Sequence, residues 1–258
     1  MASLTLCGMK CTSDGCASFT YDVTDESCVT YSTLMCDTTG ATVKATALYF
    51  STKFQDGCLV ADPAGDKKVQ LSTGVCVQLL CDTNGYTVSQ KRFDGSENFN
   101  RTWLEYKNGF GDVSGELWMG NDLLHFLTNV RPRQLRIEME NWFGEQKYAE
   151  YTVFSVANEA DNYRLTLSGF SGDVLDMFSG MHNGQVFSTV DMDNDAWVNG
   201  ACAEPASSGW WYKLCYTCNL NGLYIEDLGV DESNSLVWFY FTPGLLARPL
   251  KKSKMMFK

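Results

Sequence analysis

The stretch that decides the fold of this chain is residues 191–215, which read DMDNDAWVNGACAEPASSGWWYKLC. It contains alternating carboxylates, then a pair of cysteines, with an aromatic segment between those cysteines. Closing so short a ring between Cys202 and Cys215 would stabilise a domain by roughly 3 kcal/mol in the chain-entropy model. A disulfide at these positions would therefore hold the aromatic segment 210–212 directly behind the acidic segment.

The acidic segment places Asp191, Asp193 and Asp195 at alternate positions. Carboxylates this close repel one another unless they are solvated or hold a cation, and Ca²⁺ takes roughly six to eight oxygen ligands. The spacing is that of the first half of an EF-hand loop, but its sixth position is Ala196 rather than Gly. Its twelfth position is Cys202 rather than Glu, so the segment is not an EF-hand.

Two interpretations of the acidic segment remain open from the residues alone. One is a solvated acidic turn. The other is a calcium loop of a different kind, in which Asp193 and Asp195 give side-chain oxygens and Trp197 and Asn199 give backbone carbonyls.

Outward from this stretch, alternation of apolar and polar residues predicts strands, and glycine and proline mark the turns between them. Glycines 109 and 111 are expected to end a short helix over 98–106. No βαβ rhythm or internal repeat is present, so the pattern predicts an α+β domain with a mostly antiparallel twisted sheet, short helices and a loop-rich C-terminal part. The predicted strands are 134–140, 151–156 and 163–167, and a second short helix is predicted over 121–128.

The cysteine content indicates an oxidising compartment. Eleven cysteines are high for a cytosolic protein of 258 residues, and Asn100-Arg101-Thr102 is an N-glycosylation sequon. We therefore expect an extracellular, secreted glycoprotein, although the stretch before Cys7 is too short for a visible signal peptide. The alternative for some cysteines is a zinc site, but Cys76 and Cys81 are too far apart for a zinc knuckle with Cys215 and Cys218.

Charge and motif content exclude several classes of function. A net charge of −11 argues against nucleic acid as a partner, and no apolar run is long enough to span a membrane. Catalytic motifs are absent from the sequence, and its two histidines, His125 and His182, are expected to be structural. The sequence thus predicts a protein that is not an enzyme.

Residues 1–50 form a cysteine-rich segment of their own. The spacing Cys-x3-Cys-x4-Cys that ends at Cys16, followed by Phe19-x-Tyr21 and Cys28, resembles part of the PAN/apple module, an extracellular protein- or carbohydrate-binding unit. We expect Cys16 and Cys28 to form disulfides. The pairing of the remaining cysteines of this segment is open, so an unpaired one could link chains into a disulfide-bonded oligomer.

The rest of the chain, residues 55–258, resembles the fibrinogen C-terminal (fibrinogen-related) domain of fibrinogen chains, ficolins, tachylectins, angiopoietins and tenascins. The resemblance is carried by ordered blocks spread along this region. These blocks are Cys81-Asp82, Tyr86–Arg92, Asp94–Ser96, Asn98-Phe99, Arg101–Gly111, Gly115–Gly120, Tyr163–Leu165, Gly169–Gly172, Phe187–Thr189, Gly209–Tyr212 and Asn219–Tyr224.

The resemblance implies a set of bonds and a metal. Cys58 should pair with Cys81, and Cys202 with Cys215. Calcium should bind Asp193, Asp195 and the carbonyls of Trp197 and Asn199, or of Gly200 because this loop is one residue longer than usual. Cys76 and Cys218 fall where the family lacks cysteine, and we expect them to form an extra disulfide.

In lectin-like members of the family, a pocket beside the calcium loop binds acetyl groups or peptide termini. By resemblance, this pocket would use the Leu214–Cys215 peptide bond, often cis, with Tyr216 where the family has histidine. Glu232 and Ser233 would form its far wall. The usual donors are therefore only partly present.

The resemblance implies two alternative functions. The first is a secreted, calcium-dependent recognition protein of the ficolin or tachylectin type, which binds glycans or acetylated ligands on microbial or cell surfaces. The second is an adhesive or receptor-binding ligand, as in angiopoietins or tenascins, with Trp210–Tyr212 contacting a cell-surface receptor.

Overall fold

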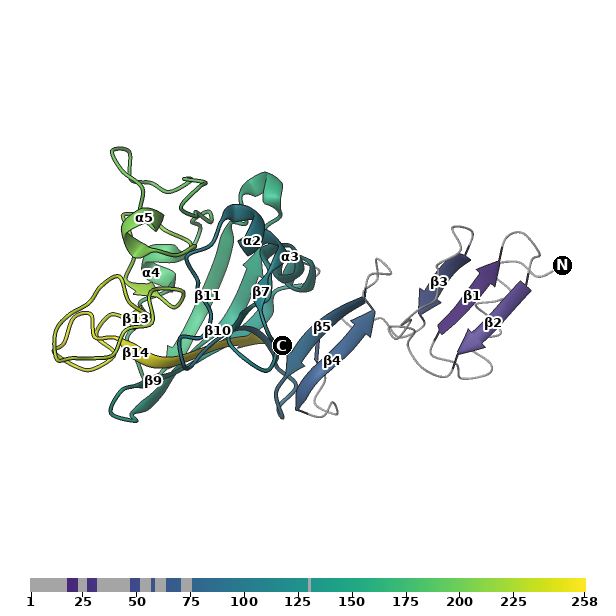
Figure 1. Cartoon of the computed structure of the whole chain (residues 1–258), viewed down its shortest axis with the longest axis horizontal. Coiled ribbons are helices and arrows are strands. Elements are labelled where there is room, and N and C mark those ends of the chain that lie inside the picture. The colour runs from purple at the N-terminus through teal and green to yellow at the C-terminus, as the bar shows by residue number, and fades with distance from the viewer. Residues whose placement is uncertain are drawn as a thin grey trace.

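A computed structural model of the chain describes residues 18–22, 27–31, 47–51, 57–58, 64–70, 76–129 and 131–258 (Figure 1). Its main element is a nine-stranded sheet in which every ladder is antiparallel. Along its main path the strands are ordered β11-β10-β9-β14-β6-β5-β4, and the short strands β7 and β8 pair beside β6. The bounds are β4 Gly65–Gln70, β5 Cys76–Cys81, β6 Thr87–Arg92, β7 Phe110–Gly111, β8 Leu117–Trp118, β9 Arg133–Asn141, β10 Gln146–Val156, β11 Leu165–Gly172 and β14 Leu250–Phe257.

The three predicted strands are confirmed as β9, β10 and β11, although each has different bounds in the structure. Along β9, buried residues such as Ile137 alternate with half-buried Arg136 and Glu138, because successive side chains of a strand point to opposite faces. The strand predicted from Tyr163 begins instead at Leu165. Asn162 and Tyr163 have φ values of +44° and +52°, so they turn the chain before β11 starts.

The helices are short, and the first starts later than predicted. Helix α2 spans Trp103–Asn108, with Thr102 as its N-cap and Gly109 as its C-cap. The prediction of helix from residue 98 is wrong because the Asn98 side chain accepts the Asn100 N–H at 2.9 Å and forms a turn there. Helix α3, Asn121–Asn129, confirms the second prediction.

The remaining elements after residue 158 are small and connect long loops. In that region, the sequence offers glycines and aromatic residues rather than long alternating runs. These elements are the 3₁₀ helix η1 Glu159–Asp161, α4 Ser179–His182, α5 Ala203–Ala206, β12 Cys218–Asn219 and β13 Val237–Trp238.

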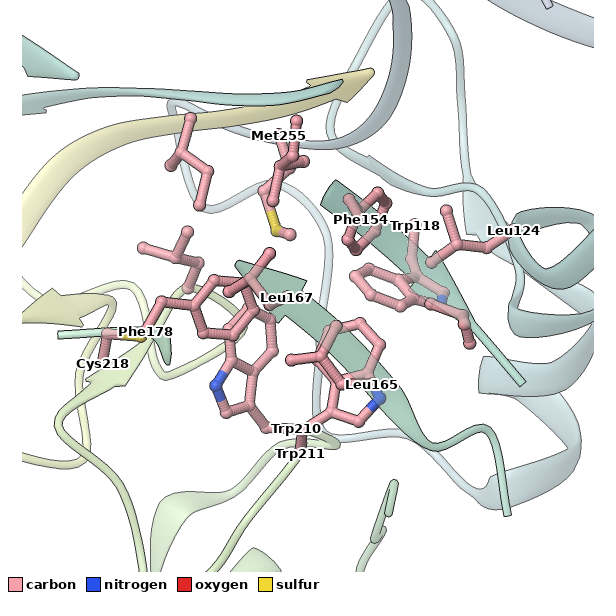
Figure 2. Close-up of a cluster of buried hydrophobic side chains, with 14 of the residues drawn as sticks. Trp118, Leu124, Phe154, Leu165, Leu167, Phe178, Trp210, Trp211, Cys218 and Met255 are labelled. Carbon is pink, nitrogen blue, oxygen red and sulfur yellow. The ribbon is translucent and has the colours of Figure 1, made fainter. Parts of the chain in front are cut away.

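Aromatic side chains fill the core between one face of the sheet and these loops. Figure 2 shows Met255 of β14 and Leu167 of β11 in one buried cluster with Trp210 and Trp211. The Trp210 ring stacks on Phe178 with centroids 5.3 Å apart. Burial of such large rings stabilises a loop-rich region that has few long strands or helices.

The cysteines confirm two predicted bonds and contradict a third. Disulfides join Cys58 to Cys81 and Cys202 to Cys215. The predicted bond between Cys76 and Cys218 is wrong, because Cys218 is a buried free thiol. Topology explains the error: Cys218 lies on β12 and packs in the core beside Phe178 (Figure 2), whereas β5 lies next to the far edge of the sheet.

A second, three-stranded antiparallel sheet with the order β2-β1-β3 is formed by β1 Ser18–Asp22, β2 Ser27–Tyr31 and β3 Ala47–Ser51. Strand β1 contains Phe19 and Tyr21 of the cysteine-rich segment. Cys16 and the side chain of Cys28 lie outside the described residues, so the pairing and the PAN/apple resemblance stay predictions. Among the described residues, no helix combines the length and apolarity that crossing a membrane requires.

Candidate functional site

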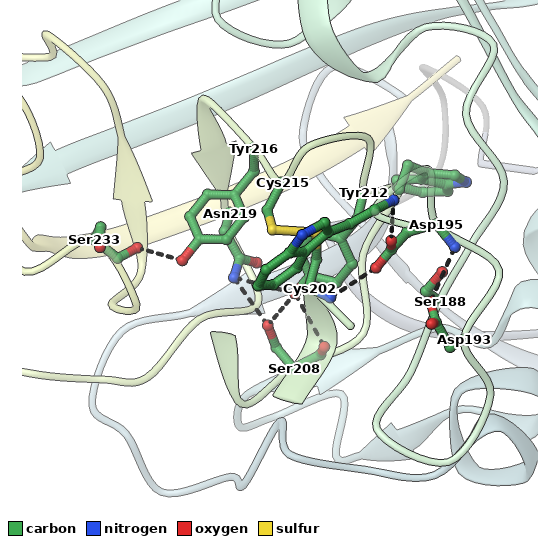
Figure 3. The surroundings of a disulfide bond; sticks show 12 residues. Ser188, Asp193, Asp195, Cys202, Ser208, Tyr212, Cys215, Tyr216, Asn219 and Ser233 are labelled. Carbon is green, nitrogen blue, oxygen red and sulfur yellow. Dashed lines mark hydrogen bonds between the residues drawn. A yellow bond between two sulfur atoms is a disulfide. The ribbon is translucent and has the colours of Figure 1, made fainter. Parts of the chain in front are cut away.

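The acidic segment and the disulfide ring meet at Asp195, as Figure 3 shows. One oxygen of its carboxylate accepts the Trp197 N–H and the other accepts the Cys202 N–H, each at 2.7 Å. A further backbone bond runs from the Ala196 N–H to the Lys213 carbonyl at 3.1 Å. Together these bonds hold the acidic loop against the ring closed by the Cys202–Cys215 disulfide.

Two of the predicted calcium ligands lie side by side. Asp193 Oδ1 accepts the Asp195 N–H at 3.1 Å. Partial burial raises the pKa of Asp195; the hydrogen bonds from Cys202 and Trp197 oppose this effect, and the negative charge of Asp193 adds to it. Within the described part of the chain, neither carboxylate has a salt bridge to a cation.

This uncompensated charge fits a divalent cation. Among the described residues, however, no three His, Cys, Asp or Glu side chains come together as a metal cluster. A calcium ion here would therefore depend on two carboxylates together with backbone carbonyls and water. The predicted carbonyl donors Trp197 and Asn199 lie on the exposed part of the same loop, and the Trp197 carbonyl also accepts the Gly200 N–H at 3.2 Å.

Asp191 has a different role from the other two aspartates. Its Oδ1 accepts the backbone N–H of Trp103 at 2.8 Å and the Thr189 hydroxyl at 2.7 Å. The carboxylate thus lies at the N-terminus of α2, where the free N–H groups and the helix dipole favour negative charge. The acidic loop is joined in this way to a helix 88 positions earlier in the chain.

The aromatic segment of the ring is buried, which corrects one expectation. Trp210, Trp211 and Tyr212 all have 0% exposure, so they do not contact a receptor. They are buried because Trp210 stacks on Phe178 and the Trp211 indole donates to the Tyr163 carbonyl at 2.8 Å. These aromatic side chains instead form a buried floor beneath the loop that the Cys202–Cys215 disulfide closes.

Apolar side chains near this floor are exposed. Leu214 is 64% exposed on the ring, and Trp197 and Val198 are 41% and 93% exposed on the acidic loop. The Ala196–Lys213 backbone bond brings these two segments together. The solvent-facing surface over residues 196–198 and 213–216 is called the loop surface below.

The predicted ligand pocket is partly closed by the protein itself. The Leu214–Cys215 peptide bond is cis, as the resemblance implies. Tyr216 donates its hydroxyl to the Ser233 carbonyl at 2.9 Å, so the structure brings these two predicted residues together. Glu232 contributes backbone contacts, with its N–H bonded to the Ala247 carbonyl at 2.8 Å.

A buried polar cluster under the ring was not predicted. The Tyr212 hydroxyl donates to the Ser208 carbonyl at 3.0 Å and also contacts the Ser208 hydroxyl, which accepts from the Asn219 amide (Figure 3). Buried polar groups of this kind need partners. The only sequence signal was their place beside the Gly-Trp-Trp-Tyr block, which does not reveal which polar residues meet.

His182 bonds on both sides to the segments that flank this site. Its Nδ1 lies 2.7 Å from the Trp211 carbonyl and therefore carries the proton, and its Nε2 accepts the Thr217 and Cys218 N–H groups at 3.3 and 3.4 Å. Complete burial lowers the pKa of His182 to about 4. His125 Nδ1 bonds to the Val156 carbonyl at 2.8 Å, so both histidines are structural, as predicted.

The glycosylation site Asn100 is exposed, in the turn just before α2. Its modification stays a prediction. The Thr102 hydroxyl of the same sequon caps α2 by accepting the Glu105 N–H.

The sequence and the structure of the chain are both similar to those of known proteins. The model of the family "Fibrinogen beta and gamma chains, C-terminal globular domain" matches residues 61–258. Angiopoietin-4 of Bos taurus is 41% identical over 169 residues, which is 64% of this chain and 34% of that protein. The chain thus spans about a third of the length of this curated relative.

Two solved structures share the fold. The fibrinogen-like globe domain of human ANGPTL2 has a TM-score of 0.70 at 36% identity, over 77% of this chain and 93% of that one. Lamprey fibrin D-dimer, solved with the peptide Gly-His-Arg-Pro-amide, has a TM-score of 0.68 at 31% identity, over 76% and 69% of the two chains.

Proposed function

Since the chain belongs to the family of fibrinogen beta and gamma C-terminal globular domains, we propose that it is a secreted, non-catalytic protein that binds a protein ligand at cell surfaces. The angiopoietin relative and the peptide-bound fibrin structure support this function. They favour it over the expectation of a lectin specific for glycans or acetyl groups.

The proposal rests on a contrast at the loop surface. Its hydrogen-bond donor Tyr216 is already bonded within the protein, whereas its apolar side chains are exposed. The Tyr216 hydroxyl already donates to the Ser233 carbonyl, so it is not free to bind an acetyl oxygen. Leu214 and Trp197 are exposed above a rigid, disulfide-closed floor. Exposed apolar groups on a rigid support are typical of protein-binding surfaces.

Calcium is part of the proposal as a structural ion. Asp193 and Asp195 would hold it together with the carbonyls of Trp197 and Asn199, and its charge would balance the two carboxylates. The chain's own groups would still set the shape of the loop surface, because Asp195 bonds to both Trp197 and Cys202.

The non-catalytic part of the proposal rests on what the titratable groups do. Both histidines of the chain bond to backbone carbonyls, and the free thiol of Cys218 is buried, which raises its pKa well above the usual value. A buried, protonated thiol is a poor nucleophile. These groups hold the structure together.

Binding to intact cells of the source organism tests the proposal. We expect the purified protein to bind cells, and we expect mild trypsin treatment of those cells to abolish binding. Leu214→Asp should weaken binding at least about tenfold, because it places an unpaired charge in an apolar contact. The matched control Leu228→Asp changes another exposed leucine, 79% exposed, and should leave binding within about twofold.

Two results would overturn the proposal. One is binding that Leu214→Asp removes and that survives trypsin but is lost after periodate oxidation of cell-surface sugars, or that is reproduced by acetylated sugars on a glycan array. The other is full binding by Leu214→Asp with correct folding, verified by circular dichroism.

A further inference from the structure

A groove of about 440 Å³ lies on the sheet, over strands β6, β14, β9 and β10. Its size falls within the roughly 300–1,000 Å³ range of ligand-binding pockets. None of its lining residues belongs to the loop surface or the acidic loop. The groove is therefore a separate site from the one in the proposed function.

The groove brings two lysines face to face. Lys91 of β6 is the direct cross-strand partner of Lys254 of β14. On its other side Lys254 is opposite Glu138 of β9, and its ammonium lies 2.7 Å from that carboxylate. Like charges directly opposite each other destabilise a sheet, so this pairing of lysines costs the fold free energy.

Lys91 has no salt bridge that would offset this cost. In the part of the chain that the structure describes, no carboxylate lies within salt-bridge distance of its ammonium. Its ammonium contacts the Ser114 carbonyl at 3.5 Å and lies 4.8 Å from the centre of the Phe93 ring, and it attracts the Asp94 carboxylate over a longer distance. An external anion above Lys91 and Lys254 would remove the repulsion between them.

Further cations extend this patch along the sheet. Lys252 projects from the same side of β14 as Lys254, about 7 Å away because a strand rises roughly 3.4 Å per residue. Its ammonium lies 3.0 Å from the Glu140 carboxylate. Arg136 lies on β9 and shares Glu138 with Lys254. Six Lys or Arg residues and three carboxylates line the groove, so it carries a net positive charge on a chain whose net charge is −11.

The composition of the groove indicates which anion fits. All four strands are internal to the sheet, so their backbone groups are paired and a peptide cannot add as another strand. None of the exposed large hydrophobic side chains lines the groove. Ammonium and guanidinium donors instead alternate with the acceptors Glu138 and Glu140 and with the Gln146 amide.

Such a surface offers charge to acidic groups and both donors and acceptors to hydroxyl groups. We propose that this groove binds an acidic saccharide, with its sulfate or carboxylate groups over Lys91, Lys254 and Lys252. The Gln146 amide donates to the Glu140 carboxylate at 2.9 Å, and the sugar hydroxyls bond to the further donor and acceptor positions of this pair. The ring of Tyr148, which lies 4.3 Å from Arg136, forms one wall.

Titration calorimetry with a size-defined heparin octasaccharide tests this site. Hyaluronan of equal length separates sulfate from carboxylate recognition, and a poly-glutamate peptide of equal charge represents a protein ligand. We expect the octasaccharide to bind at 0.15 M salt in EDTA and to bind more weakly as salt rises. EDTA removes any calcium from the acidic loop, and a soluble saccharide offers no protein ligand to the loop surface. The result therefore tests the groove separately from the proposed function.

Single charge-removing variants locate the binding. Lys91→Gln and Lys254→Gln should each weaken binding about fivefold to tenfold, since each removes one charge-assisted hydrogen bond. Arg131→Gln removes an exposed cation outside the groove and should change affinity less than about twofold. Lys91→Gln should not lower the melting temperature, because it also removes the repulsion with Lys254.

Three results would overturn the inference. They are absence of octasaccharide and hyaluronan binding at 0.15 M salt, an equal loss in Arg131→Gln, and poly-glutamate binding as tight as that of the saccharides. The last result would show a site for acidic peptides instead.

Discussion

At the scale of single residues, the histidine behind the ring shows how burial selects a protonation state. His182 accepts two backbone N–H groups on Nε2, so a second proton there would face two donors. Its pKa falls from the ordinary 6.5 to about 4, with desolvation as the main cause. The neutral ring holds Trp211 and Thr217 in place, on either side of the ring-closing cysteine.

We expect this histidine to make stability depend on pH. The unfolded chain takes up the proton near pH 6.5 and the folded chain only near pH 4. The contribution of neutral His182 to the free energy of unfolding is therefore fully present above pH 6.5. It decreases as pH falls through this window and levels off below pH 4. The total is about 3 kcal/mol.

Urea unfolding of the native protein and of His182→Gln between pH 7 and pH 4 measures this effect. The variant should be less stable at pH 7. Its free energy of unfolding should also lack the decrease between pH 6.5 and pH 4 that His182 causes. Parallel curves for the two proteins would contradict the assignment.

At the scale of elements, the acidic loop is joined to a helix as well as to the ring. Asp191 bonds to the first N–H of α2, and Thr102 and Glu105 complete a capping box there. A helix this short has little stability of its own, so its caps and its packing maintain it. The loop and the helix should therefore respond together to changes at Asp191.

Replacement of Asp191 by alanine should lower the free energy of unfolding by about 1 kcal/mol, the usual size of a lost cap. Chemical denaturation measures this loss, with Glu226→Ala as a control at an exposed acidic residue. Equal stability of the two variants would mean that the contact does not stabilise α2.

The calcium prediction also belongs to this scale, because it concerns one loop. Millimolar Ca²⁺ should raise the melting temperature, and EDTA should lower it again, since a bound ion stabilises the folded state by mass action. Asp193→Asn should remove most of this response, whereas Asp112→Asn, at a different exposed turn, should retain it. A melting temperature indifferent to Ca²⁺ in the native protein would exclude the ion.

At the scale of the whole molecule, the last strand closes the sheet. Strand β14 lies between β9 and β6 and forms ladders with both. Its Met255 and Phe257 are buried in the core. Among the described strands, β14 is therefore the one whose hydrogen bonds join β9 to β6.

A chain that ends before Leu250 should fail to fold. It would lose both ladders and leave β9 and β6 as unpaired edges over an open core. Circular dichroism and secretion from expressing cells would measure this, with removal of Lys258 alone as the control. A secreted, cooperatively folding truncated chain would show that β14 is dispensable.

Local patterns in the sequence were enough to predict much of this molecule. Alternation predicted β9 and most of β10, and the 121–128 pattern predicted α3. The motif blocks implied the Cys58–Cys81 and Cys202–Cys215 disulfides and the cis bond before Cys215. These features follow from periodicity, turn residues or ordered motifs, which can be read along the chain.

Only the tertiary structure decided which residues are buried and which distant residues contact one another. Trp210–Tyr212 became a buried floor, Asp191 bonded to a helix far away in sequence, and Cys218 stayed a free thiol. Lys91 and Lys254 meet only because β14 inserts beside β6. The physical reason is that contacts between distant segments depend on strand order and packing, and these are properties of the assembled chain.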